Sequence, residues 1–230
     1  MKTWKKVAAT ACVAAAIVFA CDKDDSFWDW MIPETEDSTT SAQVNGYVFK
    51  PAQVAATDEN ISNLRLPAGF KVAKFAESLG KPRIIAVDPS GHIYVSDREA
   101  GIVMLLKDNN NDGVSDSKST VATLPQAHGL EAHNGKLYIT TVREVFVANI
   151  NSDGTLSTPQ KIISDLPDGG QHPNRTLAIG PDGKLYISIG STCNACPESN
   201  KLNATMVRAN ADGSNLELYA KGLRNTIGFD

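Results

Sequence analysis

Alternating apolar and polar positions dominate the sequence from about residue 64 onward. Three stretches share one pattern, an apolar strand, a turn that ends in glycine, and a second alternating strand with a tyrosine at a fixed place: IAVDPSGHIYVSD, GLEAHNGKLYITT and LAIGPDGKLYISI. Alternation with period two predicts β-strands, and no helical period competes with it. The turn glycines Gly91, Gly135 and Gly183 recur at intervals of 44 and 48 residues, which indicates a repeated unit.

A second series of turns interleaves with the first. Asp-Gly pairs stand in NNNDGVSD, NSDGTLS and NADGSNLE, and Asp-Gly between alternating hydrophobic residues is a strong hairpin signal. Two hairpins in each repeat of about 45 residues give four strands per unit, as in the blade of a β-propeller. We therefore expect an all-β fold, a β-propeller of four-stranded blades, in residues 61–230. That segment has room for about three to four blades, so the sequence predicts an incomplete ring.

The first sixty residues follow a different pattern. A basic start, MKTWKK, precedes an apolar run of 14 residues (7–20), which is short for a membrane span but suits a secretory signal peptide. The run ends in VFAC, which resembles the lipobox of bacterial lipoproteins; an ordinary signal peptide followed by a chance cysteine is the alternative. We expect a lipoprotein signal peptide at 1–20, lipidation of Cys21 and an acidic tether at 21–60. The protein would then be an exported bacterial lipoprotein, anchored at the periplasm or cell surface by lipid alone.

Composition narrows the classes of partner. Of the 230 residues, 42% are hydrophobic and 21% are charged, as in globular proteins, and the net charge is −4. Binding of nucleic acid needs a basic patch, and lysine and arginine do not cluster beyond the first six residues. We expect no nucleic-acid partner.

Cys193 and Cys196 stand three residues apart in a loop-like stretch, STCNACPE. Pro197 follows where attachment of c-type haem would need a histidine, and no second Cys or His pair stands nearby for zinc. In an oxidising compartment, one interpretation is a short disulfide that staples an insertion, and the other is a redox-active pair.

Polar residues just before an inner strand are the candidates for chemistry, because propellers bind ligands with the loops around their central channel. His172, in GGQHPNRTLAIG, holds such a position, where a neutral imidazole can accept a hydroxyl proton. A hydrogen-bonded loop histidine is the alternative. His128 occupies the corresponding loop one repeat earlier, with Gln126 beside it, and both are candidate pocket-lining residues. His92 falls in a turn and is expected to be solvated.

The stretch DNNNDGVSD (108–116) resembles the front of a calcium loop. Side-chain oxygens stand at alternate positions and glycine stands at the sixth. The acidic residue expected at position twelve is missing, since Ser119 stands there. A structural calcium ion is one interpretation and an acidic hairpin turn is the other. The candidate ligands are Asp108, Asn110, Asp112 and Asp116.

Three stretches together resemble the quinoprotein sugar dehydrogenases, the family of soluble aldose/glucose and L-sorbosone/pyranose dehydrogenases. These stretches are LPAGFKVAKFA, GGQHPNRTLAIGPDGKLYISIGSTCNAC and YAKGLRNTIGFD, and the resemblance covers residues 66–230. That family is a six-bladed propeller that uses pyrroloquinoline quinone (PQQ) and holds calcium against it. The resemblance implies oxidation of an aldose, pyranose or sorbosone-like sugar, with electrons passed to an external quinone or cytochrome.

The resemblance also implies roles for single residues. His172 would be the general base that takes the proton of the sugar C1 hydroxyl while the C1 hydride passes to PQQ. Arg224 and Asn225, in KGLRNTIG, would contact PQQ. Gln171 stands where glucose dehydrogenases have an acidic residue, and it is a candidate substrate contact. The resemblance also favours a structural disulfide between the two cysteines. The family's calcium ligands would follow the Arg-Asn segment, so we expect this chain to hold part of the site and to bind PQQ weakly.

Two other functions stay open on the sequence. A non-catalytic propeller of similar ancestry would bind carbohydrate or a protein partner at the cell surface. A hydrolytic propeller of the lactonase kind would need carboxylate and asparagine ligands that point inward from several blades, and the sequence offers no such set.

Overall fold

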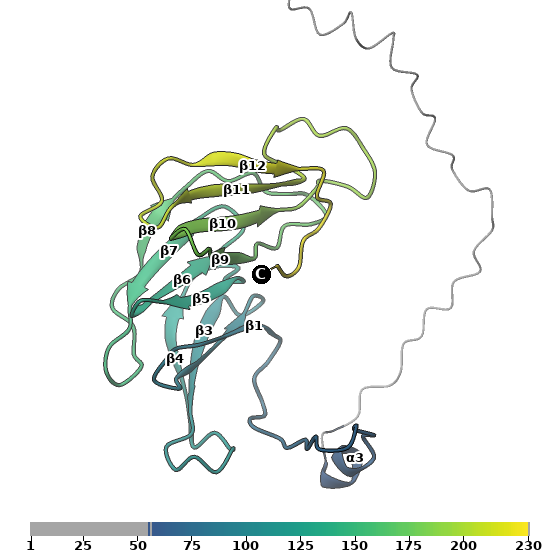
Figure 1. Ribbon diagram of the computed structural model, residues 1–230, viewed down its shortest axis with the longest axis vertical. Helices are drawn as coiled ribbons and strands as arrows, with labels where there is room; N and C mark the ends of the chain where they lie inside the picture. Colours follow the sequence, from purple (N-terminus) through teal and green to yellow (C-terminus); the bar gives the residue numbers. More distant parts are fainter. Residues whose placement is uncertain (1–54, 56, 230) are drawn as a thin grey trace, which may run out of the picture. The chain divides into compact units, whose positions relative to one another are not determined.

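The structure of the protein is a computed structural model, and it describes residue 55 and residues 57–229 (Figure 1). The chain divides into two units, and the second, Val54–Asp230, contains all the described residues. The predicted signal peptide, the lipid acceptor Cys21 and most of the predicted tether lie outside the described residues and stay predictions. Within the described part, no helix has the length and apolar composition needed to cross a membrane.

Twelve strands of the described part form three antiparallel sheets of four strands each (Figure 1). Blade 1 contains β1 (Pro82–Val87), β2 (Ile93–Asp97), β3 (Ile102–Lys107) and β4 (Ser117–Thr123). Blade 2 contains β5 (Leu130–His133), β6 (Lys136–Thr140), β7 (Val145–Asn149) and β8 (Gln160–Ile163). Blade 3 contains β9 (Leu177–Ile179), β10 (Lys184–Ile189), β11 (Thr205–Asn210) and β12 (Glu217–Lys221). A short helix, α3 (Asp58–Ser62), precedes them.

Strands pair in chain order within every blade, so the predicted all-β fold with four-stranded propeller blades is confirmed. The predicted glycine turns close the first hairpin of each blade: Gly91 between β1 and β2, Gly135 between β5 and β6, and Gly183 between β9 and β10. All three have positive φ, which side chains with a Cβ rarely adopt, and this explains why glycine recurs there. Strand β5 contacts both β1 and β9, so the first strands of the blades are neighbours.

The hydrophobic core lies between neighbouring blades. One buried cluster joins blades 1 and 2 and includes Tyr94, Leu105 and Ile139. Another joins blades 2 and 3 and includes Tyr138 and Ile187. Neighbouring sheets thus bury apolar side chains against each other. Each fully buried side chain of this size contributes about 1.5–3 kcal/mol to the stability of the fold.

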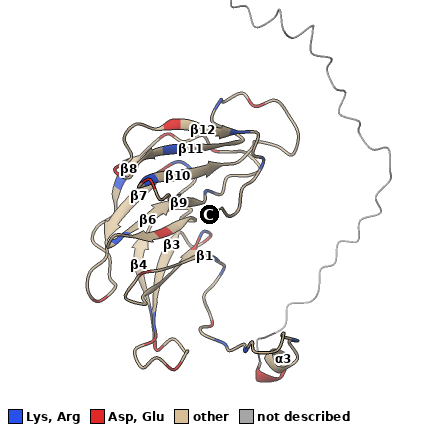
Figure 2. Cartoon of the chain, in the orientation of Figure 1, with Lys and Arg blue, Asp and Glu red and all other residues tan. Residues whose placement is uncertain are grey.

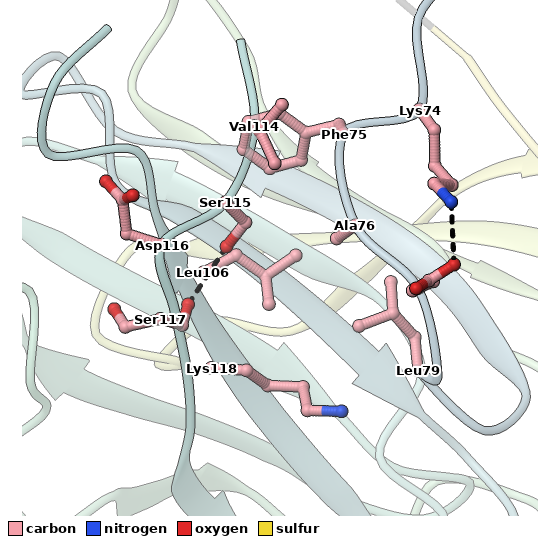
Figure 3. A pocket seen from close by; sticks show the side chains of 11 residues that line it. Lys74, Phe75, Ala76, Leu79, Leu106, Val114, Ser115, Asp116, Ser117 and Lys118 are labelled. Carbon is pink, nitrogen blue, oxygen red and sulfur yellow. Dashed lines mark hydrogen bonds and ion pairs between the residues drawn. The ribbon is translucent and has the colours of Figure 1, made fainter. Parts of the chain in front are cut away.

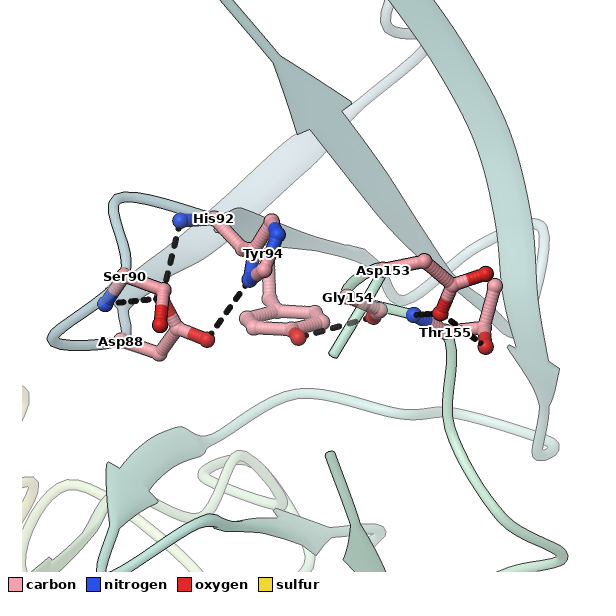
Figure 4. A network of polar contacts seen from close by, with 7 residues as sticks. All are labelled: Asp88, Ser90, His92, Tyr94, Asp153, Gly154 and Thr155. Carbon is pink, nitrogen blue, oxygen red and sulfur yellow. Dashed lines mark hydrogen bonds and ion pairs between the residues drawn. The ribbon is translucent and has the colours of Figure 1, made fainter. Parts of the chain in front are cut away.

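The repeated tyrosines take part in these contacts. Tyr94 is fully buried, and its hydroxyl donates a hydrogen bond to the carbonyl of Gly154, in the β7–β8 connection of blade 2 (2.8 Å; Figure 4). Beside it, His92 Nδ1 lies 2.8 Å from Asp88 Oδ2. The expectation of a solvated His92 is wrong, since its side chain is 14% exposed. The β7–β8 connection covers the ring, and a Cβ on Gly154 would come within 2.7 Å of it.

Charged residues of both signs are interspersed over the blades (Figure 2). On blade 3, Arg208 of β11 donates two hydrogen bonds to Glu217 of β12, through Nε (2.9 Å) and Nη2 (2.5 Å). Its guanidinium carbon lies 5.2 Å from the centre of the Tyr219 ring, a cation–π contact.

Candidate functional site

His172 lies in the loop between β8 and β9, and its ring is fixed by one residue of the neighbouring strand connection. Nδ1 lies 2.9 Å from the carbonyl oxygen of Ser191 and 3.1 Å from the Ser191 hydroxyl oxygen. A carbonyl oxygen only accepts hydrogen bonds, so Nδ1 carries the hydrogen of the neutral ring. The lone pair is then on Nε2, which makes Nε2 the atom that can accept a proton.

Ser191 also connects His172 to the predicted cofactor contacts. Its backbone N–H donates to the carbonyl of Arg224 (2.7 Å). The segment 224–229 then runs back toward β9 (Figure 1), where the Thr176 hydroxyl donates to the carbonyl of Ile227 (2.8 Å). The side chains of Arg224 and Asn225 are exposed. The structure therefore brings His172 and the Arg-Asn segment to the same end of blade 3.

The loop that carries His172 packs tightly against the residues that follow β10. Gly190 follows that strand, and a Cβ on it would lie 2.5 Å from the His172 Cβ. A Cβ on Gly170 would lie 2.6 Å from the carbonyl oxygen of Thr192. Glycine at these two positions therefore allows a backbone approach that a larger residue would block.

Arg175 holds the same loop from the inside, and no motif in the sequence marks this residue. Its side chain is fully buried (0% exposed). Nη1 donates to the carbonyl of His172 (3.2 Å), and Nη2 donates to the carbonyl of Pro167. Burial lowers the pKa of Arg175 to about 10, and the negative charge of Asp168 opposes that shift. Arginine is seldom fully buried, so the residue type alone predicts a surface position.

His128, predicted to line a pocket, is buried in the structure and makes hydrogen bonds between blades. It is 3% exposed, and its Nδ1 donates to the carbonyl of Arg175 (2.9 Å). Its own carbonyl accepts a hydrogen bond from the Ser96 hydroxyl (2.6 Å). His128 thereby connects all three blades. Its local sequence resembles that of His172, but the loop of blade 3 covers it, which the sequence does not show.

Acid should destabilise the protein through His128. Burial lowers its pKa below the ordinary 6.5, and the charges of Arg83, Arg98 and Arg175 act in the same direction. The folded state then binds fewer protons than the unfolded state, so stability falls as the pH drops below about 6.5. We expect the melting temperature of the wild type to fall more between pH 7.5 and pH 5 than that of His128→Asn. Asparagine keeps a donor for the Arg175 carbonyl and does not titrate; equal losses in both proteins would contradict the assignment.

The two predicted glutamine contacts lie in different places. Gln171 is exposed beside His172, and its backbone N–H donates to the carbonyl of Thr192 (3.0 Å). Gln126 lines a separate pocket of about 280 Å³ on blade 2. The other residues of that pocket are Pro125, Thr141, Val142, Arg143, Glu144 and Asp165. The structure therefore brings Gln171, but not Gln126, together with His172.

The candidate calcium ligands are engaged within their own loop. Asp108 accepts hydrogen bonds from the backbone of Asp112 (3.2 Å) and Gly113 (2.8 Å), and Asp116 accepts one from the backbone of Asn109 (2.7 Å). Among residues 57–229, no group of three or more His, Cys, Asp or Glu is arranged to hold a metal ion. The acidic-turn interpretation accounts for these contacts, and calcium binding stays a prediction.

A pocket of about 320 Å³ lies next to this loop on blade 1 (Figure 3). It is formed where residues 74–79 pass the beginning of β4, and the Ser115 backbone N–H donates to the carbonyl of Phe75 there (2.8 Å). The pocket shares no residue with the surroundings of His172.

The structure joins Cys193 and Cys196 by a disulfide, with their Cα atoms 6.0 Å apart. The disulfide closes a short loop directly after Ser191, whose hydroxyl donates to the carbonyl of Cys193 (2.6 Å). The stapled loop is thus attached to the residue that holds His172.

Comparison with known proteins identifies the family. Residues 64–230 match the TrAA12-like family. The chain belongs to this family. A relative of similar sequence is an uncharacterized protein of Borreliella burgdorferi, 27% identical over an alignment of 188 residues that covers 76% of this chain and 48% of that protein.

Two solved structures share the fold of this TrAA12-like chain. The holo form of the pyranose dehydrogenase PQQ domain from Coprinopsis cinerea has a TM-score of 0.63 and 21% identity, over 71% of this chain and 44% of that one. The calcium structure of a Trichoderma reesei carbohydrate-active enzyme of family AA12 has a TM-score of 0.51 and 24% identity, over 59% of this chain and 36% of that one. The chain spans half or less of the length of each. The family match and the shared β-propeller fold confirm the resemblance to quinoprotein sugar dehydrogenases.

Proposed function

We propose that this chain carries the proton-accepting part of a PQQ-dependent dehydrogenase that oxidises an aldose, a pyranose or a sorbosone-like sugar. The observation that carries the proposal is the shared position of His172 and Arg224 on the two sides of Ser191. The similar structure from Coprinopsis cinerea, a pyranose dehydrogenase PQQ domain, supports the choice of cofactor and substrate class.

The residues present fit PQQ. Arg224 is exposed, and among the described residues its guanidinium forms no ion pair. A guanidinium fork suits the carboxylates of this anionic cofactor, and Asn225 adds amide donors and an acceptor. PQQ, when bound, supplies a quinone that accepts a hydride. Calcium is part of the proposal, with the ligands that the family resemblance places after the Arg-Asn segment.

The protein's own residues would handle the proton. Oxidation of a pyranose at C1 removes a hydride from carbon and a proton from the hydroxyl, which leaves a lactone. His172 Nε2 would take that proton, and the ring would become an imidazolium with both nitrogens protonated. The Ser191 carbonyl, 2.9 Å from Nδ1, faces the positive charge that develops on the ring. Gln171, exposed beside His172, would bond a sugar hydroxyl.

Electrons would then leave to an external quinone or cytochrome. The proposal includes a lipid anchor at Cys21 and location at the periplasm or cell surface, which rest on the N-terminal sequence alone. Anchoring would hold the enzyme near acceptors in the membrane.

Dye reduction by the full-length protein tests the proposal. With added PQQ and Ca²⁺, we expect an artificial dye to be reduced only when both PQQ and a suitable sugar are present. Aldoses, pyranoses and sorbosone-like sugars should be compared. Binding of sugar without any dye reduction would instead support the alternative, a non-catalytic carbohydrate-binding propeller.

A further inference from the structure

Glu198 lies outside the residues so far assigned to the chemistry, yet both of its carboxylate oxygens are used by one residue of the site. Oε1 accepts a hydrogen bond from the backbone N–H of Thr192 (2.8 Å), and Oε2 accepts one from the Thr192 hydroxyl (2.9 Å). Hydrogen bonds to an ionised carboxylate are stronger than those between neutral groups, so this pair fixes the Thr192 backbone firmly.

Thr192 in turn fixes the loop that carries His172. Its carbonyl accepts a hydrogen bond from the Gln171 backbone N–H (3.0 Å), next to His172 in the chain. Its backbone also lies so close to Gly170 that a Cβ there would be 2.6 Å from the carbonyl oxygen. A displacement of Thr192 would therefore move the His172 loop.

Thr192 also determines where the Ser191 carbonyl points, because the two residues share a peptide bond. That carbonyl oxygen, 2.9 Å from His172 Nδ1, is what assigns the hydrogen to Nδ1 and the lone pair to Nε2. If the peptide rotates, the ring loses the acceptor that distinguishes its two nitrogens. The second attachment of this segment is the disulfide loop 193–196, which follows directly.

We propose that Glu198 is a positioning residue, which holds the Ser191–Thr192 peptide and thereby the orientation and tautomer of His172. The inference rests on the proposed function of His172 as a base. Glu198 touches neither sugar nor cofactor in this proposal; both oxygens are occupied by Thr192. Which ring nitrogen of a histidine carries the proton is set by the hydrogen bond that the other nitrogen makes.

The tautomer is the readout that a merely structural role would not move. In full-length protein with ¹⁵N-labelled histidine, long-range ¹⁵N–¹H correlation distinguishes a protonated from an unprotonated ring nitrogen. We expect wild-type His172 to have Nδ1 protonated and Nε2 unprotonated at a pH where the ring is neutral. In Glu198→Ala, the two nitrogens should move toward averaged shifts. Glu217→Ala, which removes a carboxylate of β12 that accepts hydrogen bonds from Arg208 of β11, is the matched control and should leave His172 unchanged.

Kinetics of the same variants complete the test. We expect Glu198→Ala to lower kcat about 10-fold or more, because the base is misplaced, and to raise KM to a smaller extent, because Gln171 lies in the same loop. Glu198→Gln keeps one acceptor for the Thr192 N–H, so it should recover part of both the tautomer signature and kcat. If the alanine variant does not fold, the glutamine variant is compared with the wild type instead. A His172 signature identical in wild type and Glu198→Ala would overturn the inference. If the signature changes as expected but even the wild type oxidises no sugar, the positioning role stands and the proposed function fails.

Discussion

His172→Asn is expected to lower kcat for sugar oxidation by about 10²–10⁴-fold, the range that general base catalysis contributes. The Nδ2 of asparagine takes the place of histidine Nδ1 and can donate to the Ser191 carbonyl, 2.9 Å from Nδ1 in the wild type. The variant therefore keeps the anchor of the loop and loses only the proton acceptor Nε2. Steady-state dye reduction by the full-length protein measures kcat, and a thermal melt shows whether the fold is retained.

His133→Asn is the control for this substitution. His133 ends β5 in a hairpin turn and takes no part in the His172 contacts. The control should keep wild-type kcat. Wild-type activity in His172→Asn would remove His172 from the mechanism, whereas a large loss of melting temperature in that variant would show that the residue mainly supports the loop.

Arg175→Ala is expected to destabilise the protein by about 3–5 kcal/mol, the range found when large buried side chains are truncated to alanine. The change leaves a cavity in a fully buried position and removes the donors to the carbonyls of His172 and Pro167. Chemical denaturation measures the free energy of unfolding. Arg175→Lys, which keeps the charge but not the fork of donors, should lose less than alanine does.

The stability lost in Arg175→Ala should not depend on pH near neutrality. The pKa of Arg175 is lowered to about 10 in the folded protein, so below that pH both the folded and the unfolded states carry the charge. The energetic effect of the shift changes only as the pH rises above about 10, toward the ordinary pKa of arginine. The control is Arg208→Ala, at the exposed pair with Glu217, which should change the melting temperature little. Equal stability of Arg175→Ala and Arg208→Ala would contradict the role given to Arg175.

The blades could be predicted from the sequence because the signals are local. The interval between Gly91, Gly135 and Gly183 reflects a turn that needs positive φ, and it repeats once in each blade. Alternation marks the strands, and in β6 the two alternating sets of residues are buried against different blades, Leu137 and Ile139 against blade 1 and Tyr138 against blade 3. Neither signal needs knowledge of distant residues, and the structure confirms the four-stranded units.

The positions of His128 and Arg175 depend on packing between blades, and the sequence does not contain that information locally. His128 and His172 precede inner strands in the same way, yet the first is buried and donates to the carbonyl of Arg175.

Ser191 could have been found from topology alone. Because β9 and β10 are antiparallel, the residues after β10 lie at the same end as the loop before β9. The acidic loop at 108–116 illustrates an ambiguity, because Asp and Asn that suit calcium also suit turns closed by the backbone.

Single-turnover reduction of PQQ in the full-length protein tests the central claim most directly. The absorbance of added PQQ would be followed after mixing with a pyranose that carries hydrogen or deuterium at C1. We predict reduction only when sugar is present, a slower rate with deuterium at C1, and almost no reduction in His172→Ala. A protein that binds the sugar and leaves PQQ oxidised, in the wild type as in His172→Ala, would contradict this claim.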